Sequence, residues 1–223
     1  MRKSKHEGVI KLTIEQALHQ RHSVRKFTDQ PVSLATVREI LAAAQLAPSW
    51  VNSQPYQIHL AMGASLERVR QQQAAQEAAG KAGTPDLPVM SRQDWSAQAQ
   101  RNMADWSAGL GDAGQAMGAT AAQLYHAPVV LYLTLPKGYS NWSLYDLGSL
   151  GNSIVLAATD RGLASMTAYQ FIKYPQMLRR ELAIPADEDI IVGIGLGYRD
   201  DQALVNTIRA TRMSLDEILT VHD

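Results

Sequence analysis

Residues 21–27, RHSVRKF, carry the side chains best suited to binding an anion. Arg21, Ser23 and Arg25 alternate in this segment, so all three point to the same side where the chain is extended. Two guanidinium groups and a hydroxyl in one row suit a phosphate or an electron-rich ring. A solvated turn explains the same residues, and for the segment taken alone it is the simpler interpretation.

A second polar segment, APSWVNSQPYQ over residues 47–57, offers hydrogen-bonding groups to the edge of a ligand. Pro48 and Pro55 fix its ends, because proline restricts its own φ and the residue before it. The hydroxyls and amides between them belong to Ser49, Asn52, Ser53 and Gln54. A solvated turn is again the simpler interpretation when this loop is considered alone.

Three glycines alternate in the strand-like segment DIIVGIGLGYRD. Gly193, Gly195 and Gly197 therefore share one face, and the apolar residues between them occupy the other. Glycine weakens a strand, so the bare face indicates that something flat, or another backbone, comes very close. A planar ligand and a closely packed helix fit this pattern equally well. The spacing is not the dinucleotide-binding fingerprint, because no glycine-opened helix follows.

The composition excludes several kinds of chemistry. The 223 residues include no cysteine, which removes thiolate nucleophiles, disulfides, iron–sulfur clusters and thiolate zinc sites. Lys and Arg number 21, as do Asp and Glu, so a nucleic acid partner or an anionic membrane is not expected. His19 and His22 lack a third metal ligand, and we predict no metal site. The basic N-terminus is followed by no apolar stretch, so we expect a cytoplasmic protein.

Hydrophobic periodicity predicts a chain of helices and strands that position these segments. The predicted helices cover residues 13–21, 33–47, 65–80, 94–110, 116–125, 144–161 and 174–182. The predicted strands cover residues 56–62, 127–135, 163–169 and 189–198. Thr13 and Ser33 are the expected N-caps of the first two helices. Residues 80–93, rich in glycine and proline, are expected to form a surface loop.

Two of these helices have distinctive side-chain patterns. In the helix predicted over 94–110, Trp95 and Trp106 are eleven residues apart and share a face, which indicates either a packing seam or a lid over a ligand. The helix predicted over 144–161 is rich in small residues, although an interior glycine costs about 1 kcal/mol relative to alanine. Small residues let another backbone approach closely, so we expect a close helix contact there, such as one across a dimer.

In this order, the segments resemble the FMN-dependent nitroreductase family, and the ending VNTIRATR is most similar to its nitrobenzoate-reductase branch. The resemblance runs through RHSVRKF, APSWVNSQPY, HAPVVLYL, DLGSLGNSIVLAATDRGL and IIVGIGLGY. It implies an α+β, three-layer α-β-α fold with a mixed sheet, in one FMN-binding domain over residues 1–223. It also implies an intertwined homodimer with FMN at the interface. Residues 64–120 match least well and are expected to form a variable helical insertion or lid.

The resemblance assigns a set of residues to the flavin site. They are Arg21, His22, Ser23, Arg25, Pro48, Ser49, Trp50, Asn52, Gln54, Gln170, Arg209 and Arg212. Within this set, Arg21 and Arg212 are expected at the phosphate, with Arg209 in place of a lysine that relatives often carry at position 210. Arg25 is expected beside the electron-rich edge of the ring, and the backbone amide of Gln170 at its N5 atom. Pro48, Ser49 and Asn52 are expected to come from the partner subunit, and Gln54 follows in the same loop.

The resemblance also implies an activity. It predicts an oxidoreductase that transfers hydride from NADH or NADPH to nitroaromatics, quinones or related acceptors by a ping-pong mechanism. A flavin brings its own redox chemistry, which accounts for a chain without a catalytic dyad. Two alternatives stay open: an FMN-dependent dehydrogenase, enone reductase or deiodinase of the same family, and a flavin-binding redox protein without a small-molecule substrate.

Overall fold

The computed structural model describes residues 11–222, so His6 and most of the basic N-terminal segment lie outside the described residues. The helices are α1 (Ile14–Gln20), α2 (Leu34–Ala44), α3 (Gly63–Ala78), α4 (Ala97–Ala108), α5 (Gly111–Gln115), α6 (Met117–Ala122), α7 (Asn141–Asp160) and α8 (Pro175–Leu182). The strands are β1 (Gln57–Met62), β2 (Val129–Pro136), β3 (Ala164–Ala168) and β4 (Glu188–Gly197). None of these helices is long and apolar enough to cross a membrane.

Local capping explains where the first helices begin. Thr13 accepts a hydrogen bond from the Gln16 amide, and the Gln16 side chain accepts one from the Thr13 amide. Ser33 caps α2 in the expected way by accepting from the Thr36 amide. Both predicted N-termini are therefore confirmed.

The four strands form one sheet in the order β1-β2-β4-β3. Every neighbouring pair is antiparallel, so the expectation of a mixed sheet is wrong for residues 11–222. The parallel contact that the structure describes is an isolated bridge between Ser23 and Ser165, which attaches the RHSVRKF segment to the edge of β3. That attachment places the cationic segment at one border of the sheet.

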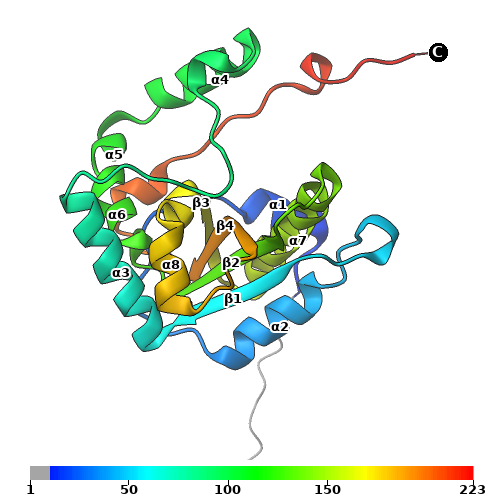
Figure 1. Ribbon diagram of the computed structural model, residues 1–223. Helices are drawn as coiled ribbons and strands as arrows, with labels where there is room; N and C mark the ends of the chain where they lie inside the picture. Colours follow the sequence, from blue (N-terminus) through cyan, green and yellow to red (C-terminus); the bar gives the residue numbers. More distant parts are fainter. Residues whose placement is uncertain (1–10, 223) are drawn as a thin grey trace, which may run out of the picture.

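Helices cover both faces of the sheet, which gives the three layers that the resemblance implies (Figure 1). On one face, α2 and α7 pack on Leu131, Leu133 and Ile194, all without exposed surface. On the other face, α3 and α8 pack on Val130 and Tyr132. A sheet that is apolar on both faces must be covered in this way.

The glycine face of β4 is filled by a side chain of the same molecule. Phe171, in the 3₁₀ turn Tyr169–Ile172, lies against it with no exposed surface. A Cβ at Gly195 would lie 2.7 Å from Phe171 Cζ, so the ring occupies the space that alanine would need. Close packing therefore explains the glycines, and the planar-ligand interpretation of this face is wrong.

The region between α3 and β2 differs most from the predicted elements. The helix predicted over 94–110 begins only at Ala97, so Trp95 precedes it and shares no helical face with Trp106. No residue of α4 is fully buried, and Met103 and Trp106 are half-buried, so the helix does not contribute a seam to the core of this chain. The helix predicted over 116–125 is shorter, since α6 ends at Ala122 and a separate 3₁₀ turn follows. In Figure 1, α4 and the C-terminal tail both project from the body.

Candidate functional site

A cavity of about 730 Å³ opens between the end of α1, helix α7 and the strands β3 and β4. Its polar lining residues are Arg21, Ser23, Asn152, Ser165, Thr167 and Arg212. Its remaining lining residues are Leu18, Leu87, Leu144, Leu147, Gly148, Gly151, Val155, Ile191, Val192 and Ile194. An apolar cleft with a few convergent polar groups is the usual form of a small-molecule site.

The cations expected at a phosphate meet in this cavity. Arg21 follows the last turn of α1, and Arg212 reaches the same cavity from the C-terminal tail. The guanidinium of Arg212 donates only to the backbone carbonyls of Ala210 and Thr211. Within residues 11–222, neither arginine forms an ion pair with a carboxylate. Two uncompensated guanidinium groups in one cavity favour an anionic ligand.

The small residues of α7 form one wall of this cavity. Gly148, Gly151 and Asn152 line it from one side of the helix. A Cβ added at Gly148 would meet no protein atom within 4 Å. Within the chain, this face of the helix is therefore open to a ligand rather than pressed against another helix.

Arg25 lies beside the cavity but does not line it. The chain bends at Arg25, whose backbone amide donates to Asn206 Oδ1 at 2.7 Å, and this bend breaks the alternation predicted from the sequence. Its Nη1 donates to the carbonyl of Ser23 at 3.1 Å, and its guanidinium lies 5.9 Å from the Trp106 ring centroid. Arg25 is only 8% exposed and its Nε has no partner. Burial lowers the pKa of Arg25, which is the electrostatic cost of a cation without an anion.

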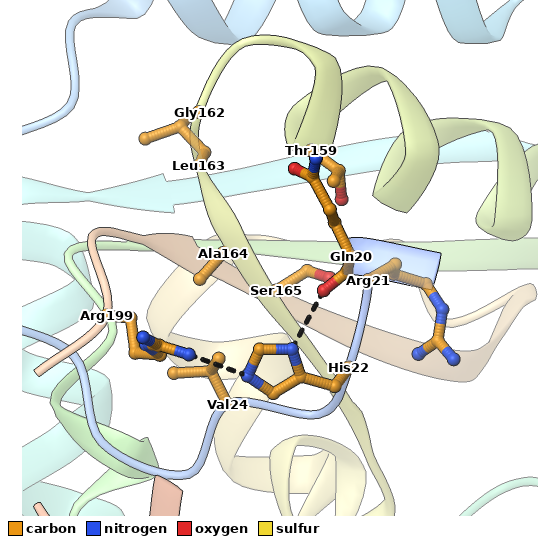
Figure 2. A pocket seen from close by; sticks show the side chains of 10 residues that line it. All are labelled: Gln20, Arg21, His22, Val24, Thr159, Gly162, Leu163, Ala164, Ser165 and Arg199. Carbon is orange, nitrogen blue, oxygen red and sulfur yellow. Dashed lines mark hydrogen bonds between the residues drawn. The ribbon is translucent and has the colours of Figure 1, made fainter. Parts of the chain in front are cut away.

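His22 lies on the other side of the RHSVRKF segment and lines a separate cavity of about 220 Å³ (Figure 2). Its Nδ1 is 2.9 Å from the carbonyl of Gln20, so Nδ1 carries the proton that is donated there. Arg199 Nη1 then lies 3.4 Å from the unprotonated Nε2. Burial, followed by the charges of Arg209, Arg199 and Arg21, lowers the pKa of His22 against the raising effect of the Gln20 hydrogen bond. His22 is therefore a neutral side chain at pH 7 and does not face the larger cavity.

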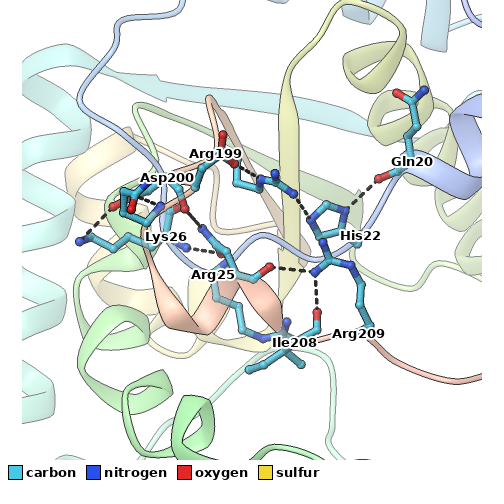
Figure 3. Close-up of polar contacts among 11 residues, drawn as sticks. Gln20, His22, Arg25, Lys26, Arg199, Asp200, Ile208 and Arg209 are labelled. Carbon is cyan, nitrogen blue, oxygen red and sulfur yellow. Dashed lines mark hydrogen bonds and ion pairs between the residues drawn. The ribbon is translucent and has the colours of Figure 1, made fainter.

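Arg209 is turned back onto its own backbone. Its Nη1 donates to the carbonyls of Asn206 at 2.8 Å and Ile208 at 3.0 Å (Figure 3). Arg209 does not line the cavity that holds Arg21 and Arg212. The phosphate role expected for it stays a prediction.

The residues expected from the polar loop all lie outside this chain's own cavity. They are Pro48, Ser49, Trp50, Asn52 and Gln54. The loop is fastened at its base, where the Trp50 amide donates to Oδ2 of the buried Asp146 at 3.0 Å. Within it, the Gln54 amide donates to Ser49 Oγ at 3.0 Å.

The tip of this loop is strained and exposed. Val51 adopts φ 47° although its side chain is β-branched, and Asn52 and Gln54 also have positive φ. Residues held in such conformations cost about 1–3 kcal/mol each and concentrate at ligand-binding sites and switches. Val51 is 83% exposed, so no contact within this chain explains the strain.

Gln170 points away from the cavity. Its side chain donates to Glu77 Oε1 at 2.7 Å, and its carbonyl accepts from Gln73 at 3.1 Å. The cavity is reached in this part of the chain by Thr167 instead. Neither contact involves the Gln170 backbone amide, so the role expected for that amide at the ring's N5 atom stays a prediction.

Sequence reasoning missed several residues of the cavity wall. Val192 and Ile194 belong to the apolar face of β4, so the ligand side of that strand is opposite to the glycine side. Their alternation was the signal available in the sequence. Leu87 comes from a segment predicted to be a surface loop, and no periodicity in the sequence marks it.

A family model and individual known proteins match this chain. A family model described as the Nitroreductase family matches residues 18–198. Nitrobenzene nitroreductase of Ectopseudomonas oleovorans is 29% identical over 225 residues, which cover 94% of this chain and 97% of that protein. 4-Nitrobenzoate reductase of Pseudomonas putida is 28% identical, with 86% of this chain and 88% of that protein covered.

Two solved structures share the fold at high similarity. The FMN-dependent nitroreductase NfnB from Mycobacterium smegmatis in complex with NADPH superposes with a TM-score of 0.85 at 26% identity, covering 94% of this chain and 97% of that one. The FMN and NADPH-dependent nitroreductase NfnB from sphigopyxis sp. strain HMH superposes with a TM-score of 0.84 at 30% identity, covering 95% and 100%.

Proposed function

Because this chain belongs to the Nitroreductase family, we propose that it is an FMN-dependent oxidoreductase that uses NADPH or NADH to reduce nitroaromatic compounds. The names of its relatives support both the cofactor and the acceptor. Nitrobenzene and 4-nitrobenzoate are the acceptors in the names of two relatives, and FMN and NADPH are named with two solved structures.

The observation that carries the proposal is the cavity that holds Arg21, Ser23 and Arg212. It combines two uncompensated cations with an apolar wall that includes Val192 and Ile194. A ligand with a phosphate group and a flat aromatic ring satisfies both parts. FMN, when bound, supplies the two-electron redox chemistry, and the chain binds it, orients it and sets its electrostatic surroundings.

The unpartnered Nε of Arg25 is a second observation that fits this cofactor. A buried guanidinium without an anion is costly, and an electron-rich ring edge beside it reduces that cost. Ser23 lines the cavity, and its carbonyl is the group that holds Nη1 of Arg25. We therefore propose that Arg25, although it does not line the cavity, lies next to the bound ring.

The proposed active form is a homodimer with the loop 48–54 completing the partner subunit's cavity. Trp50 and Trp142 stack with ring centroids 5.0 Å apart and are 56% and 57% exposed. Tyr145 extends this aromatic patch and is 72% exposed. An exposed patch of this kind marks an interaction surface. The strained loop beside this patch does not line the cavity of its own chain. In a dimer it would line the cavity of the second copy.

The kinetic part of the proposal is a ping-pong mechanism, in which the donor leaves before the acceptor binds. The electron donor and the acceptor would then bind one after the other in the same place beside the flavin ring. Quinones are proposed as further acceptors, since they are flat and accept two electrons. The cytoplasmic location and the single domain over residues 1–223 also stay predictions.

A reduction and reoxidation experiment tests the proposed function. Purified protein incubated with FMN and desalted should be yellow, and its colour should bleach anaerobically on addition of NADPH or NADH. Nitrobenzene, 4-nitrobenzoate and a quinone should each restore the colour, with oxygen as a separate comparison. Protein that stays colourless after incubation with FMN would contradict the proposed cofactor. Yellow protein that neither donor bleaches would contradict the proposed enzyme and leave a flavin-binding redox protein.

A further inference from the structure

The segment over residues 80–93 is fastened to the body of the molecule. Figure 1 shows it leaving the end of α3 and running back toward α4. The Thr84 amide donates to the carbonyl of Lys173 at 3.0 Å, and the Tyr174 hydroxyl donates to the carbonyl of Lys81 at 3.0 Å. These bonds attach the first half of the segment to the residues just before α8.

Asp86 is the strongest attachment of this segment. Its two carboxylate oxygens accept from Nη1 and Nη2 of Arg179 at 3.2 and 2.8 Å. Oδ2 also accepts from the backbone amide of Ile190 at 2.8 Å. The side chains of Asp86 and Arg179 are only 13% and 17% exposed, so the pair is largely shielded from water. A two-pronged arginine–carboxylate pair fixes direction as well as distance.

The residue next to this anchor, Leu87, is part of the cavity wall. Asp86 holds Ile190, and the following residues, Ile191 and Val192, line the same cavity. The anchor thus fixes Leu87 relative to strand β4, which forms another part of the cavity wall. Among the residues that line the cavity, Leu87 alone comes from the segment over residues 80–93.

We propose that Leu87 limits the size of the aromatic acceptor that enters the cavity, and that Asp86 is the positioning residue that holds Leu87 in place. This rests on the proposed function. Leu87 is half-buried, packs against the apolar cluster that α2 and α7 cover, and also lines the cavity, so the size of its side chain sets how much of the cavity is open to an acceptor.

Three variants of the FMN-loaded enzyme test this proposal, with nitrobenzene compared against nitrobenzenes that carry a bulky para substituent. Leu87→Ala should raise kcat/KM for the bulky acceptor relative to nitrobenzene by about 10-fold, mainly through KM. Leu87→Phe should lower the same ratio. Val89→Ala is the matched control, since Val89 is 67% exposed in the same segment and does not line the cavity. Equal changes for all acceptors, or a changed FMN affinity with an unchanged ratio, would overturn the role of Leu87.

Asp86→Asn tests the positioning role with a second readout. Hydrogen exchange over residues 82–90 should become faster, and the acceptor ratio should move in the direction of Leu87→Ala. Combining it with Arg179→Gln should change exchange by less than the sum of the two single effects, because both remove the Asp86–Arg179 pair, while Arg179→Gln also removes a hydrogen bond to the carbonyl of Glu188. Asp86→Glu keeps the charge and should restore part of the protection. Asp94→Asn, an exposed position nearby, is the control.

Unchanged exchange and an unchanged ratio in Asp86→Asn would overturn the positioning role. A wild-type enzyme that fails to bleach with NADPH or NADH would overturn the proposed function instead. The exchange measurement is independent of activity, so the two failures are distinguishable.

Discussion

The ring of Phe171 occupies the place where a side chain at Gly195 would begin. A methyl group at Gly195 would lie 2.7 Å from Phe171 Cζ and 3.1 Å from Ala127 Cβ. Phe171 has no exposed surface, so its ring has no free space into which it could withdraw.

Gly195→Ala should therefore destabilise the fold by about 1–3 kcal/mol through overpacking. Urea unfolding followed by circular dichroism measures this change. Gly118→Ala is the control, because Gly118 lies in α6 and a Cβ there meets nothing within 4 Å. A Gly195→Ala protein as stable as the wild type would show that the ring moves aside without cost.

Arg21→Ala and Arg212→Ala should each weaken FMN binding. Charge-assisted hydrogen bonds to a phosphate contribute about 1.5–3 kcal/mol each, which corresponds to a Kd raised by one to two orders of magnitude. Quenching of flavin fluorescence on titration with apoprotein gives the Kd. Arg180→Ala, at an exposed position of α8, should leave it unchanged. Wild-type affinity for FMN in both variants would show that the phosphate does not bind at these two arginines.

Gly148→Ala should stabilise the fold and at the same time weaken FMN binding. Alanine in place of glycine in a helix interior stabilises by about 1 kcal/mol, and no protein atom opposes the added methyl group. The thermal midpoint of the apoprotein should rise. Because Gly148 lines the cavity, the same methyl group should weaken FMN binding. Stabilisation with unchanged affinity would place the ligand away from α7.

Arg25→Met should change the electronics of the bound cofactor. The substitution removes the charge proposed to lie beside the ring. Methionine keeps most of the length of the side chain that packs against Trp106. Loss of about 1.4 kcal/mol of stabilisation corresponds to roughly 30 mV for a two-electron couple. We expect the midpoint potential to fall by tens of millivolts in a spectroelectrochemical titration while FMN stays bound. A potential equal to that of the wild type would leave Arg25 as a purely structural residue.

His22 should make the fold less stable in acid. Its pKa is lower in the folded protein than the ordinary value near 6.5, so the unfolded chain binds more protons between these two values. Stability from neutral His22 is thus complete above about pH 6.5 and is lost as the pH falls through the folded-state pKa. His22→Gln should reduce the difference between the free energies of unfolding at pH 8 and pH 5. His19→Gln, at an exposed position, is the control.

Much of the framework could be predicted because it depends on local chemistry. The caps at Thr13 and Ser33 and the apolar run of β2 each follow from a few neighbouring residues. Strand direction does not, since it is decided by packing between distant segments, and the expected mixed sheet proved antiparallel. Phe171 could not be matched to the glycine face from spacing alone for the same reason.

The candidate site was predictable to the same degree. Arg21 and Ser23 share the cavity as their alternation indicates, but Arg25 does not, because Asn206, 181 residues away, binds its amide and bends the chain. Leu87 gave no signal, since its position depends on an ion pair between Asp86 and a helix far along the chain. Long-range hydrogen bonds therefore account for both differences.

Arg212 lines two cavities. Besides the cavity with Arg21, it lines a groove of about 680 Å³ between α4 and the C-terminal tail, together with Trp106 and Met103. An anion that reorients the Arg212 side chain would also change the wall of the groove beside α4, because the same side chain lines both, and ligand binding and the position of α4 would then be linked. Such linkage is reciprocal: if an anion on Arg212 biases α4, then anything that binds in the α4 groove must bias the affinity for the anion by the same factor.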